Sequence, residues 1–464
     1  MCCSLRPSQQ VLHGLAPNAA LVVTREHKRK EKERGVRRIR VFMLGWEFPP
    51  YFAGGVGIVC AQLCKALANL GVEVTYCMPS GPQAVNEVEG AGGEGFRLII
   101  ANNTVPDDKI SLLPVDSLLH AYATPASYNA LLERSLAMNR FDGGSKPLYG
   151  EDLWAEVHRF AEKVRIIAAH LAETEGFDVI HAHDHWTFPA GVAAKYATGK
   201  PLVVHVHITE FDKSGGAGVD QRVYDMERYG MEHADVVIAV SDFVKQRLIT
   251  SYGVPAEKIR VVHNAAVPLQ EGKVHDIKVK QGDKVVLFAG RVTLQKGPEY
   301  FVEAARIVAE RDPNVKFVLA GSGDQLGRMI DRVAELGLSQ RFFFTGFYDR
   351  NQAEVLFSMA DVFVMPSVSE PFGVVPLEAM VKGTPCIISK QSGVSEVLHH
   401  CIKVDFWDVQ SLAEHILSLL HYQALHHELK QHGYLEVKRL TWDVPAGKCL
   451  QVYQEVVGKE GVAW

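Results

Sequence analysis

Residues 367–380 read SVSEPFGVVPLEAM and follow the short apolar run VFVMP at residues 362–366. A run of β-branched and aromatic residues of this length is typical of a buried strand in a parallel sheet. A polar loop and Gly373 come next, and the apolar residues up to Met380 then predict a helix beginning near Gly373. The stretch therefore predicts a strand, a loop and a helix start, whose unpaired N–H groups suit a phosphate or a polyhydroxyl ligand.

Two carboxylates frame this stretch. Glu370 lies in the loop, and Glu378 is expected one to two turns inside the helix. They are therefore placed to hold different parts of one extended ligand. Two glutamates in a helical region also fit a solvated face. Glu378, however, lies among apolar neighbours, where a charge is costly without a partner, and this favours a functional role.

The pattern Glu-x-Phe-Gly-x-x-x-Leu-Glu-Ala, with seven residues between the two glutamates, resembles the signature of the retaining nucleotide-sugar glycosyltransferases of family 4. The glycogen and starch synthases are among the relatives of this family. The resemblance implies an α/β protein of GT-B architecture. Two Rossmann-like, doubly wound domains would then face each other across a cleft.

Length and composition set the broad class. A chain of 464 residues suggests two or three domains, and 47% hydrophobic with 22% charged residues is ordinary for a globular protein. The net charge of -5 argues against nucleic acid as the main partner. No apolar run approaches the roughly 20 residues that a membrane span needs. The eight cysteines form no CxxC pair, which predicts free thiols in a reducing, cytoplasmic compartment.

The first 37 residues end in the basic run HKRKEKERGVRR and contain no apolar segment of signal-peptide length. We expect a solvated, disordered leader. A peripheral contact with acidic lipids is the alternative function of this segment.

The first regular pattern is an apolar strand at residues 39–44, a glycine loop, an amphipathic helix and a second strand at 72–77. This order predicts the start of a Rossmann-like domain, although the loop lacks the dinucleotide fingerprint G-x-G-x-x-G. Gly55 and Gly57 let the backbone approach a ligand at the helix N-terminus. The family resemblance implies that this loop faces the donor phosphates. Glycogen and starch synthases carry a lysine before their paired glycines, whereas residues 50–53 read PYFA, which argues against an α-glucan synthase.

The sequence HAHDHW at residues 181–186 follows a predicted strand at 178–180. Three histidines and an aspartate in five positions suggest a metal, but the spacing differs from the di-zinc hydrolase signature. Alternation along an extended segment would also place the histidines on one side and Asp184 on the other. We therefore expect His183 or Asp184 to contact the acceptor at the end of a strand, and expect no metal.

The next predicted strand, at residues 201–206, is followed by His207. Open α/β sheets place their chemistry at such carboxyl ends, although a core histidine is the ordinary alternative. The resemblance implies that His207 lies near the donor sugar and the leaving pyrophosphate and orients the sugar. Glu210, Asp212 and Lys213 follow on the same loop and are candidates for binding the acceptor.

A second run of alternating elements begins with a strand at residues 285–289 and the loop GRVTLQKG. Arg291 offers a fork for phosphate oxygens and Lys296 a point charge. Sugar transfer from a nucleotide donor needs a cation on the leaving diphosphate when no metal supplies one. The family's glycine-arginine and lysine-glycine pairs fall on Gly290 with Arg291 and on Lys296 with Gly297.

Further strands are predicted at residues 315–320, 342–345, 362–365 and 385–389, with helices between them. This alternation predicts a second doubly wound sheet. The resemblance implies that the loop at Phe347 reads the nucleotide base through its backbone.

The predicted organisation is a leader (1–37), an acceptor-side domain (38–266), a linker (267–283), a nucleotide-sugar-binding domain (284–440) and a final helix returning to the first domain (441–464). The resemblance implies that cations neutralise the diphosphate, that Glu370 binds the sugar and that Glu378 binds the ribose. The predicted catalytic residues are His207, Glu370, Arg291 and Lys296. The predicted donor-binding residues are Gly55, Gly57, Gly290, Gly321, Phe347, Phe372, Gly373, Val374, Leu377 and Glu378. The acceptor-side candidates are His183, Asp184 and Glu210.

The predicted function is retaining, metal-independent transfer of a hexose, with glucose as first choice, to a hydroxyl of a carbohydrate or lipid. The donor is a nucleoside-diphosphate sugar, and no cofactor is expected. Alternatives on the same architecture are a nucleotide-sugar epimerase, a glucan phosphorylase with lysine-bound pyridoxal, and a sugar-nucleotide-binding regulator without turnover.

Overall fold

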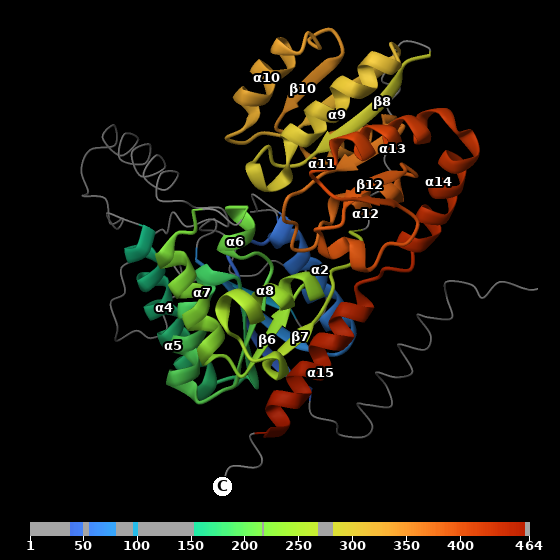
Figure 1. Cartoon of the computed structure of the whole chain (residues 1–464). Helices are drawn as coiled ribbons and strands as arrows, with labels where there is room; N and C mark the ends of the chain where they lie inside the picture. The colour runs from blue at the N-terminus through green and yellow to red at the C-terminus, as the bar shows by residue number, and fades with distance from the viewer. Residues whose placement is uncertain are drawn as a thin grey trace, which may run out of the picture.

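The computed structural model describes residues 38–49, 55–79, 96–100, 153–215, 218–267 and 282–459. The predicted leader, most of the predicted linker and the loop at residues 50–53 lie outside these ranges. The described chain forms two lobes, one blue to green and one yellow to red in Figure 1. Each lobe is built around its own parallel sheet.

The first sheet has, within the described residues, seven parallel strands in the order β3-β2-β1-β4-β5-β6-β7. The strands are β1 Arg40–Leu44, β2 Glu73–Met78, β3 Phe96–Ile100, β4 Val179–His183, β5 Leu202–Val206, β6 Val236–Ala239 and β7 Ile259–Val261. The reversal of strand order between β1 and β4 marks the carboxyl edge where doubly wound sheets bind ligands.

Helices cover both faces of this sheet because its strands are apolar on both sides. Along β1, Phe42 and Leu44 join a core with α4 and α5, while Val41 and Met43 pack with α2 and α15. The helices are α2 Gly55–Asn69, α4 Leu153–Glu173, α5 Phe188–Thr198, α6 Glu210–Lys213, α7 Gln221–His233 and α8 Asp242–Tyr252, with 3-10 turns η1 His185–Thr187 and η2 Ala256–Lys258.

The second sheet has six parallel strands in the described chain, ordered β10-β9-β8-β11-β12-β13. They are β8 Lys284–Ala289, β9 Val315–Ala320, β10 Phe342–Gly346, β11 Val362–Met365, β12 Cys386–Ser389 and β13 Ile402–Val404. The associated helices are α9 Pro298–Arg311, α10 Leu326–Glu335, α11 Arg350–Met359, α12 Val375–Val381, α13 Val409–His421 and α14 Gln423–Val437, with 3-10 turns η3 Leu294–Lys296 and η4 Gly393–Glu396. The two doubly wound parallel sheets confirm the predicted fold class.

The last helix, α15 (Asp443–Lys459), lies along the first lobe, as the red helix in Figure 1 shows. Its buried residues pack with those of α2. Tyr453 places its hydroxyl 2.7 Å from Nδ1 of His181, and Glu455 forms an ion pair of 2.7 Å with Arg260. The chain thus passes through both lobes and returns to the first. None of the described helices is both long and apolar enough to span a bilayer.

The structure differs from the sequence-based expectations at several elements. β4 extends to His183, beyond the predicted end at residue 180, and the strands β3 and β13 were not expected. α12 begins at Val375, two residues later than predicted, because Gly373 adopts a φ of 98° and Val374 is the N-cap. Glu378 therefore lies in the first turn of α12, where the sequence analysis placed it deeper in the helix.

Candidate active site between the two sheets

The loop between β11 and α12 holds Glu370, of which only 6% is exposed. Its carboxylate forms an ion pair with the ammonium of Lys296 and accepts a hydrogen bond of 3.3 Å from the Ser367 hydroxyl. The backbone is fixed as well, because the Glu370 N–H donates to the Gln391 carbonyl at 3.0 Å. The structure therefore brings together the two residues that the sequence analysis placed on the sugar and on the diphosphate.

Glycine at position 297 makes this pairing possible. Gly297 has a φ of 63°, and a Cβ atom there would lie 2.2 Å from the carbonyl oxygen of Pro366. Only a glycine lets the turn after Lys296 approach the end of β11 so closely. Gln295, also in this turn, donates to the Ser369 carbonyl at 3.0 Å. Gly297 therefore allows η3, which carries Lys296, to pack against the loop of Glu370.

Further cations gather at the same place from both lobes. Arg291 follows Gly290 at the end of β8 and is exposed. Lys213, at the end of α6 in the first lobe, lies 3.2 Å from Nε2 of His185. Burial lowers the pKa of the Lys213 ammonium. The Arg291 guanidinium lowers this pKa as well, whereas the carboxylates of Glu227, Glu210 and Asp184 act to raise it. An anion placed between the lobes would therefore meet several positive charges.

The predicted nucleotide end of the site lies along β9, β10 and α12. Gly321 ends β9, with its N–H donating to the Gly346 carbonyl at 2.9 Å. Phe347 is 77% exposed on the loop after β10. Burial raises the pKa of the Glu378 carboxyl to about 7, although the positive charge of Arg350 acts to lower it. Glu378 also contributes to the raised pKa of Tyr348, so this carboxyl lies near the Phe347 loop.

Other predicted donor residues belong to the backbone of this region. The Phe372 ring is buried and its carbonyl accepts from the Val394 N–H at 2.7 Å. Val374 is half-buried at the N-cap of α12. Leu377 is fully buried in the apolar core, and its N–H donates to the Val374 carbonyl. Its side chain therefore belongs to the core, away from the surface of the loop.

The first lobe contributes the start of α2. Gly55 is the first residue of that helix and is exposed, whereas Gly57 is buried. The Gly57 N–H donates to a carboxylate oxygen of Glu47 at 2.9 Å. Sequence reasoning missed Glu47, although a glutamate among apolar residues in the segment GWEFPP was a usable signal. The carboxylate therefore caps the first turn of α2.

His207 lies directly after β5 and is buried. Burial lowers its pKa to about 3, so the imidazole is neutral. Its Nε2 atom lies 2.9 Å from Nδ1 of His183, and its backbone N–H donates to Asp184 at 2.7 Å. His207 is therefore suited to hydrogen bonding with a neutral group such as a sugar hydroxyl.

Asp184 is the one non-glycine residue with a positive φ (59°) among those that the structure describes. Its carboxylate accepts from the N–H groups of His207 and Ile208 at 2.7 and 3.3 Å. Burial raises its pKa to about 7, although the hydrogen bond from His207 opposes this. Asp184 thus holds the loop that carries His207, and His183 holds its ring. Their predicted contact with the acceptor stays a prediction.

The loop after β5 divides into a half-buried and a buried part. Glu210 is half-buried, and burial raises its pKa. Asp212 is fully buried and accepts hydrogen bonds from Thr209 at 2.7 Å and from Ser369 of the second lobe at 2.6 Å. Asp212 also pairs with Arg247 at 3.1 Å. Asp212 thus links the two lobes, and its predicted contact with the acceptor stays a prediction.

A second contact between the lobes involves Glu396, which the sequence analysis did not single out. Its carboxylate accepts from the N–H groups of Asp242 and Phe243 at 2.9 and 2.7 Å and lies 2.7 Å from Nε2 of His263. Burial acts to raise the Glu396 pKa, but these hydrogen bonds outweigh it and the pKa is lowered. Beside it, the Ser241 hydroxyl donates to the Pro371 carbonyl at 2.6 Å. We call Glu396, Asp242, Phe243, His263 and Ser241 with Pro371 the interlobe latch.

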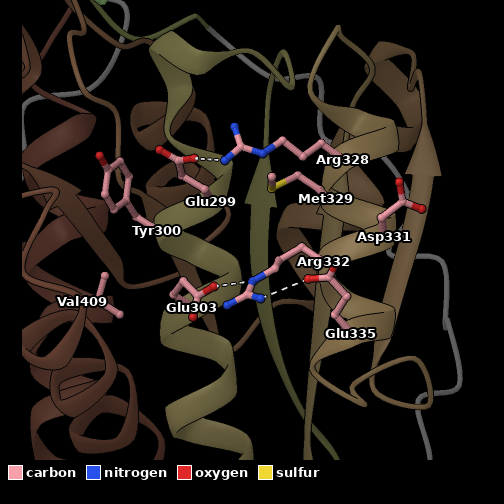
Figure 2. Close-up of a pocket in the computed structure, with 9 residues that line it drawn as sticks. All are labelled: Glu299, Tyr300, Glu303, Arg328, Met329, Asp331, Arg332, Glu335 and Val409. Carbon is pink, nitrogen blue, oxygen red and sulfur yellow. Dashed lines mark hydrogen bonds and ion pairs between the residues drawn. The ribbon is translucent and has the colours of Figure 1, made fainter.

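A separate pocket of about 630 Å³ lies between α9 and α10, away from the predicted site residues. Figure 2 shows that Arg328 and Arg332 of α10 pair with glutamates of α9 across the pocket. Arg332 contacts Glu303 at 2.7 Å, and Arg328 contacts Glu299 at 3.4 Å. These internal ion pairs account for the polar lining, and we assign this pocket no function.

Two family matches cover the chain, one over each of the two sheets. The family described as Glycosyltransferase Family 4 matches residues 53–267, and the family described as Glycosyl transferases group 1 matches residues 271–436. An uncharacterized glycosyltransferase of Methanocaldococcus jannaschii is 29% identical over 379 residues, which cover 78% of this chain and 83% of that protein. A glycogen synthase of Mycobacterium tuberculosis is 25% identical over 366 residues, covering 78% and 80%.

Solved structures share the same fold. The sucrose-phosphate synthase of Thermosynechococcus elongatus superposes with a TM-score of 0.66 at 21% identity, over 91% of this chain and all of that one. The Anabaena protein HepE, solved with UDP and glucose, gives 0.62 at 16% identity, over 90% of this chain and all of that one. The two family matches in tandem, the relatives and the fold together show that this chain belongs to the family 4-like glycosyltransferases of GT-B architecture.

Proposed function

We propose that the protein is a retaining, metal-independent hexosyltransferase, with glucose as first choice, that uses a nucleoside-diphosphate sugar. The observation that carries this proposal is the ion pair between Lys296 and Glu370, with Arg291 and Lys213 nearby. Cations beside a carboxylate, at the carboxyl ends of two parallel sheets, support the binding of a diphosphate and a sugar at this position.

The cations would act on the leaving group. Transfer breaks the bond between the anomeric carbon and the diphosphate oxygen, so negative charge develops on that oxygen. Fixed positive groups stabilise such charge without a metal ion. Arg291 and Lys296 are assigned this role from the second lobe, and Lys213 supports them from the first.

Glu370 is assigned the sugar hydroxyls. Without a ligand, its carboxylate is the partner of Lys296. A bound diphosphate would compete for the Lys296 ammonium and leave Glu370 to accept hydrogen bonds from the hydroxyls. The backbone at Phe372–Val374, turned by Gly373, lines the same position. Glu378 is assigned the ribose and the backbone at Phe347 the base, in line with their neighbouring positions.

Retention is assigned to front-face attack by the acceptor hydroxyl, on the side from which the diphosphate leaves. Two buried carboxylates of the first lobe support this assignment because they are engaged elsewhere. Asp184 holds two backbone N–H groups, and Glu227 accepts from the Glu210 N–H at 2.9 Å and from the Tyr252 hydroxyl. His207, being neutral, would orient the sugar.

The acceptor is a hydroxyl of a carbohydrate or a lipid-linked sugar. The names of two relatives support the two classes of acceptor, carbohydrate and lipid-linked sugar. One is the mannosylfructose-phosphate synthase of Agrobacterium fabrum, and another is an Escherichia coli galactosyltransferase named for a diphosphoundecaprenol-linked sugar. The buried free thiols support a reducing, cytoplasmic compartment. A contact of the basic leader with acidic lipids is part of the same proposal.

The test uses the full-length protein, a panel of UDP-, ADP- and GDP-hexoses, and carbohydrate and lipid-linked acceptors. Released nucleoside diphosphate is measured in EDTA and in added Mg²⁺ or Mn²⁺, and the anomeric configuration of the product is read by NMR. We expect acceptor-dependent release at equal rates in all three buffers, with the donor's configuration kept. An inverted product would contradict retention, and a requirement for added metal would contradict metal independence. Donor binding without release for any acceptor would favour the regulator.

A further inference from the structure

Four histidines share one face of the first sheet at the carboxyl ends of β4 and β5. His181 and His183 alternate on β4, and His205 of β5 is in register with His183. His207 follows two residues later. The ring centres of His181, His183 and His205 lie 4.3, 5.4 and 5.1 Å apart. A His-x-His pair on one strand and a third histidine on its neighbour therefore lie side by side, because side chains two residues apart lie on the same face of a strand.

The three rings are buried and their outer nitrogens lack partners. His181, His183 and His205 are at most 2% exposed. Within the described part of the chain, Nε2 of His181, Nε2 of His183 and both ring nitrogens of His205 make no hydrogen bond. Buried polar groups nearly always have a partner, and each missing one is destabilising. Several missing partners in one cluster indicate a ligand that all three rings share.

The other ring nitrogens are oriented by neighbours. Nδ1 of His181 lies 2.7 Å from the hydroxyl of Tyr453 on α15, and Nδ1 of His183 lies 2.9 Å from Nε2 of His207. Histidines that bind metals usually have this arrangement, in which the second nitrogen is held by a hydrogen bond that fixes the ring. In both residues the nitrogen without a partner is Nε2.

We propose that His181, His183 and His205 bind a zinc ion. One ring nitrogen of each lies within 4.8 Å of one from each of the others. Zinc–nitrogen bonds of about 2.0–2.1 Å set ligand atoms roughly 3.3 Å apart in a tetrahedron, which small side-chain rotations would reach. Three imidazoles leave the fourth position for a water molecule. The ion would tie β4 to β5 and, through Tyr453, to α15.

No step of the proposed transfer reaction passes through this ion. The ion lies inside the first lobe, whereas the diphosphate is assigned to Arg291 and Lys296 of the second. The sequence-based argument against a metal considered only residues 181–186, and the third ligand proposed here comes from the next strand. The group Asp242, His263 and Glu396 also has the spacing of metal ligands, but the hydrogen bonds of the interlobe latch already account for it.

The test measures metal in the full-length protein, purified without a metal-affinity step. Elemental analysis is expected to find about one zinc per chain. His181→Gln and His205→Gln should lose it. The control is His185→Gln, a buried histidine of the same segment outside the triad, which should keep its zinc. Chelation should lower Tm, and Zn²⁺ but not Mg²⁺ should restore it. Co²⁺ in place of zinc should give the visible bands of a tetrahedral ion.

Two results would overturn the proposal. One is a wild-type protein that contains no zinc and whose Tm does not respond to Zn²⁺. The other is a folded His205→Gln variant that holds zinc like the wild type. If the variants fail to fold, the zinc content and the Co²⁺ spectrum of the wild type decide alone. No readout depends on sugar transfer, so failure here leaves the transferase proposal standing.

Discussion

The two halves of the candidate site differ in charge although the same architecture builds both. The second lobe offers Lys296, Glu370 and Arg291, which carry full charges, on loops shaped by glycines. The first lobe offers one cation, Lys213, beside His207 and His183, which burial keeps neutral. This difference matches the two parts of a nucleotide-sugar donor. In the proposed function, the diphosphate lies at the cations of the second lobe, and the sugar lies between Glu370 of that lobe and the neutral His207 of the first.

The two halves also differ in how their residues are distributed along the chain. In the second lobe, the site residues lie in two short loops, which Lys296 with Glu370 and Gln295 with Ser369 join across 74 residues. In the first lobe, single residues at the ends of different strands meet, as when Asp184 after β4 holds the His207 N–H after β5. A motif within one short loop is visible in the sequence, whereas single residues brought together from different strands are not.

The largest effect is expected when one positive charge is removed from the second lobe, because the comparison assigns the diphosphate to these charges. Lys296→Ala should lower kcat/KM by about 10²–10³-fold, because a fixed donor to the leaving group is lost. Steady-state release of nucleoside diphosphate measures the effect. Lys284→Ala is the matched control, since Lys284 begins β8, at the opposite end of the strand, and pairs with Asp361. Equal activities of the two variants would contradict the assigned role.

The sequence predicted most of the fold and the second half of the site. Most strands were placed within one to three residues because buried parallel strands are short apolar runs, as in VFVMP. The glutamate, lysine and glycine positions were visible because they lie within single loops. The strand β3 was missed among glycine-rich segments. The cluster of His181, His183 and His205 and the interlobe latch were missed because they depend on register and on contacts over about 130 residues or more, as between Ser241 and Pro371.

The titration of Glu378 sharpens the comparison, since this carboxyl is the charged group at the ribose end. Its pKa of about 7 means that it ionises across the neutral range. If only the carboxylate accepts from the ribose hydroxyls, the donor KM should rise roughly tenfold as the pH falls from about 8 to about 6. Glu378→Gln should show a raised KM that no longer depends on pH in this range. A wild-type KM that is flat with pH would contradict the ribose assignment.

The interlobe latch tests whether the halves must be held together. Glu396→Gln removes a charged acceptor from two backbone N–H groups and His263. We expect a loss of about 1–2 kcal/mol in unfolding free energy and a several-fold rise in donor KM. Urea denaturation and kinetics measure these effects. Glu414→Gln, at an exposed position of α13, is the control. Stability and KM equal to those of the control would show that the latch is not needed for closure.

The smallest effect is expected at Phe347. Because 77% of this residue is exposed, Phe347→Ala should leave stability within about 0.5 kcal/mol of the wild type. If the base is read through the backbone, the donor KM should change by less than about threefold, because substitutions of surface side chains usually have small energetic effects. A much larger rise would show that the ring itself stacks on the base. Thermal denaturation and donor kinetics distinguish the two outcomes.

The most direct test of the account is calorimetric titration of a nucleoside diphosphate in EDTA. The ligand is the diphosphate that gives the largest thermal shift with the wild type, and it is titrated into wild type, Lys296→Ala and Lys284→Ala. We predict that Lys296→Ala binds at least about tenfold more weakly, which corresponds to 1.4 kcal/mol for one lost charged contact. Lys284→Ala should bind like the wild type. Equal affinity of all three proteins would contradict the claim that the second lobe recognises the diphosphate through its own cations.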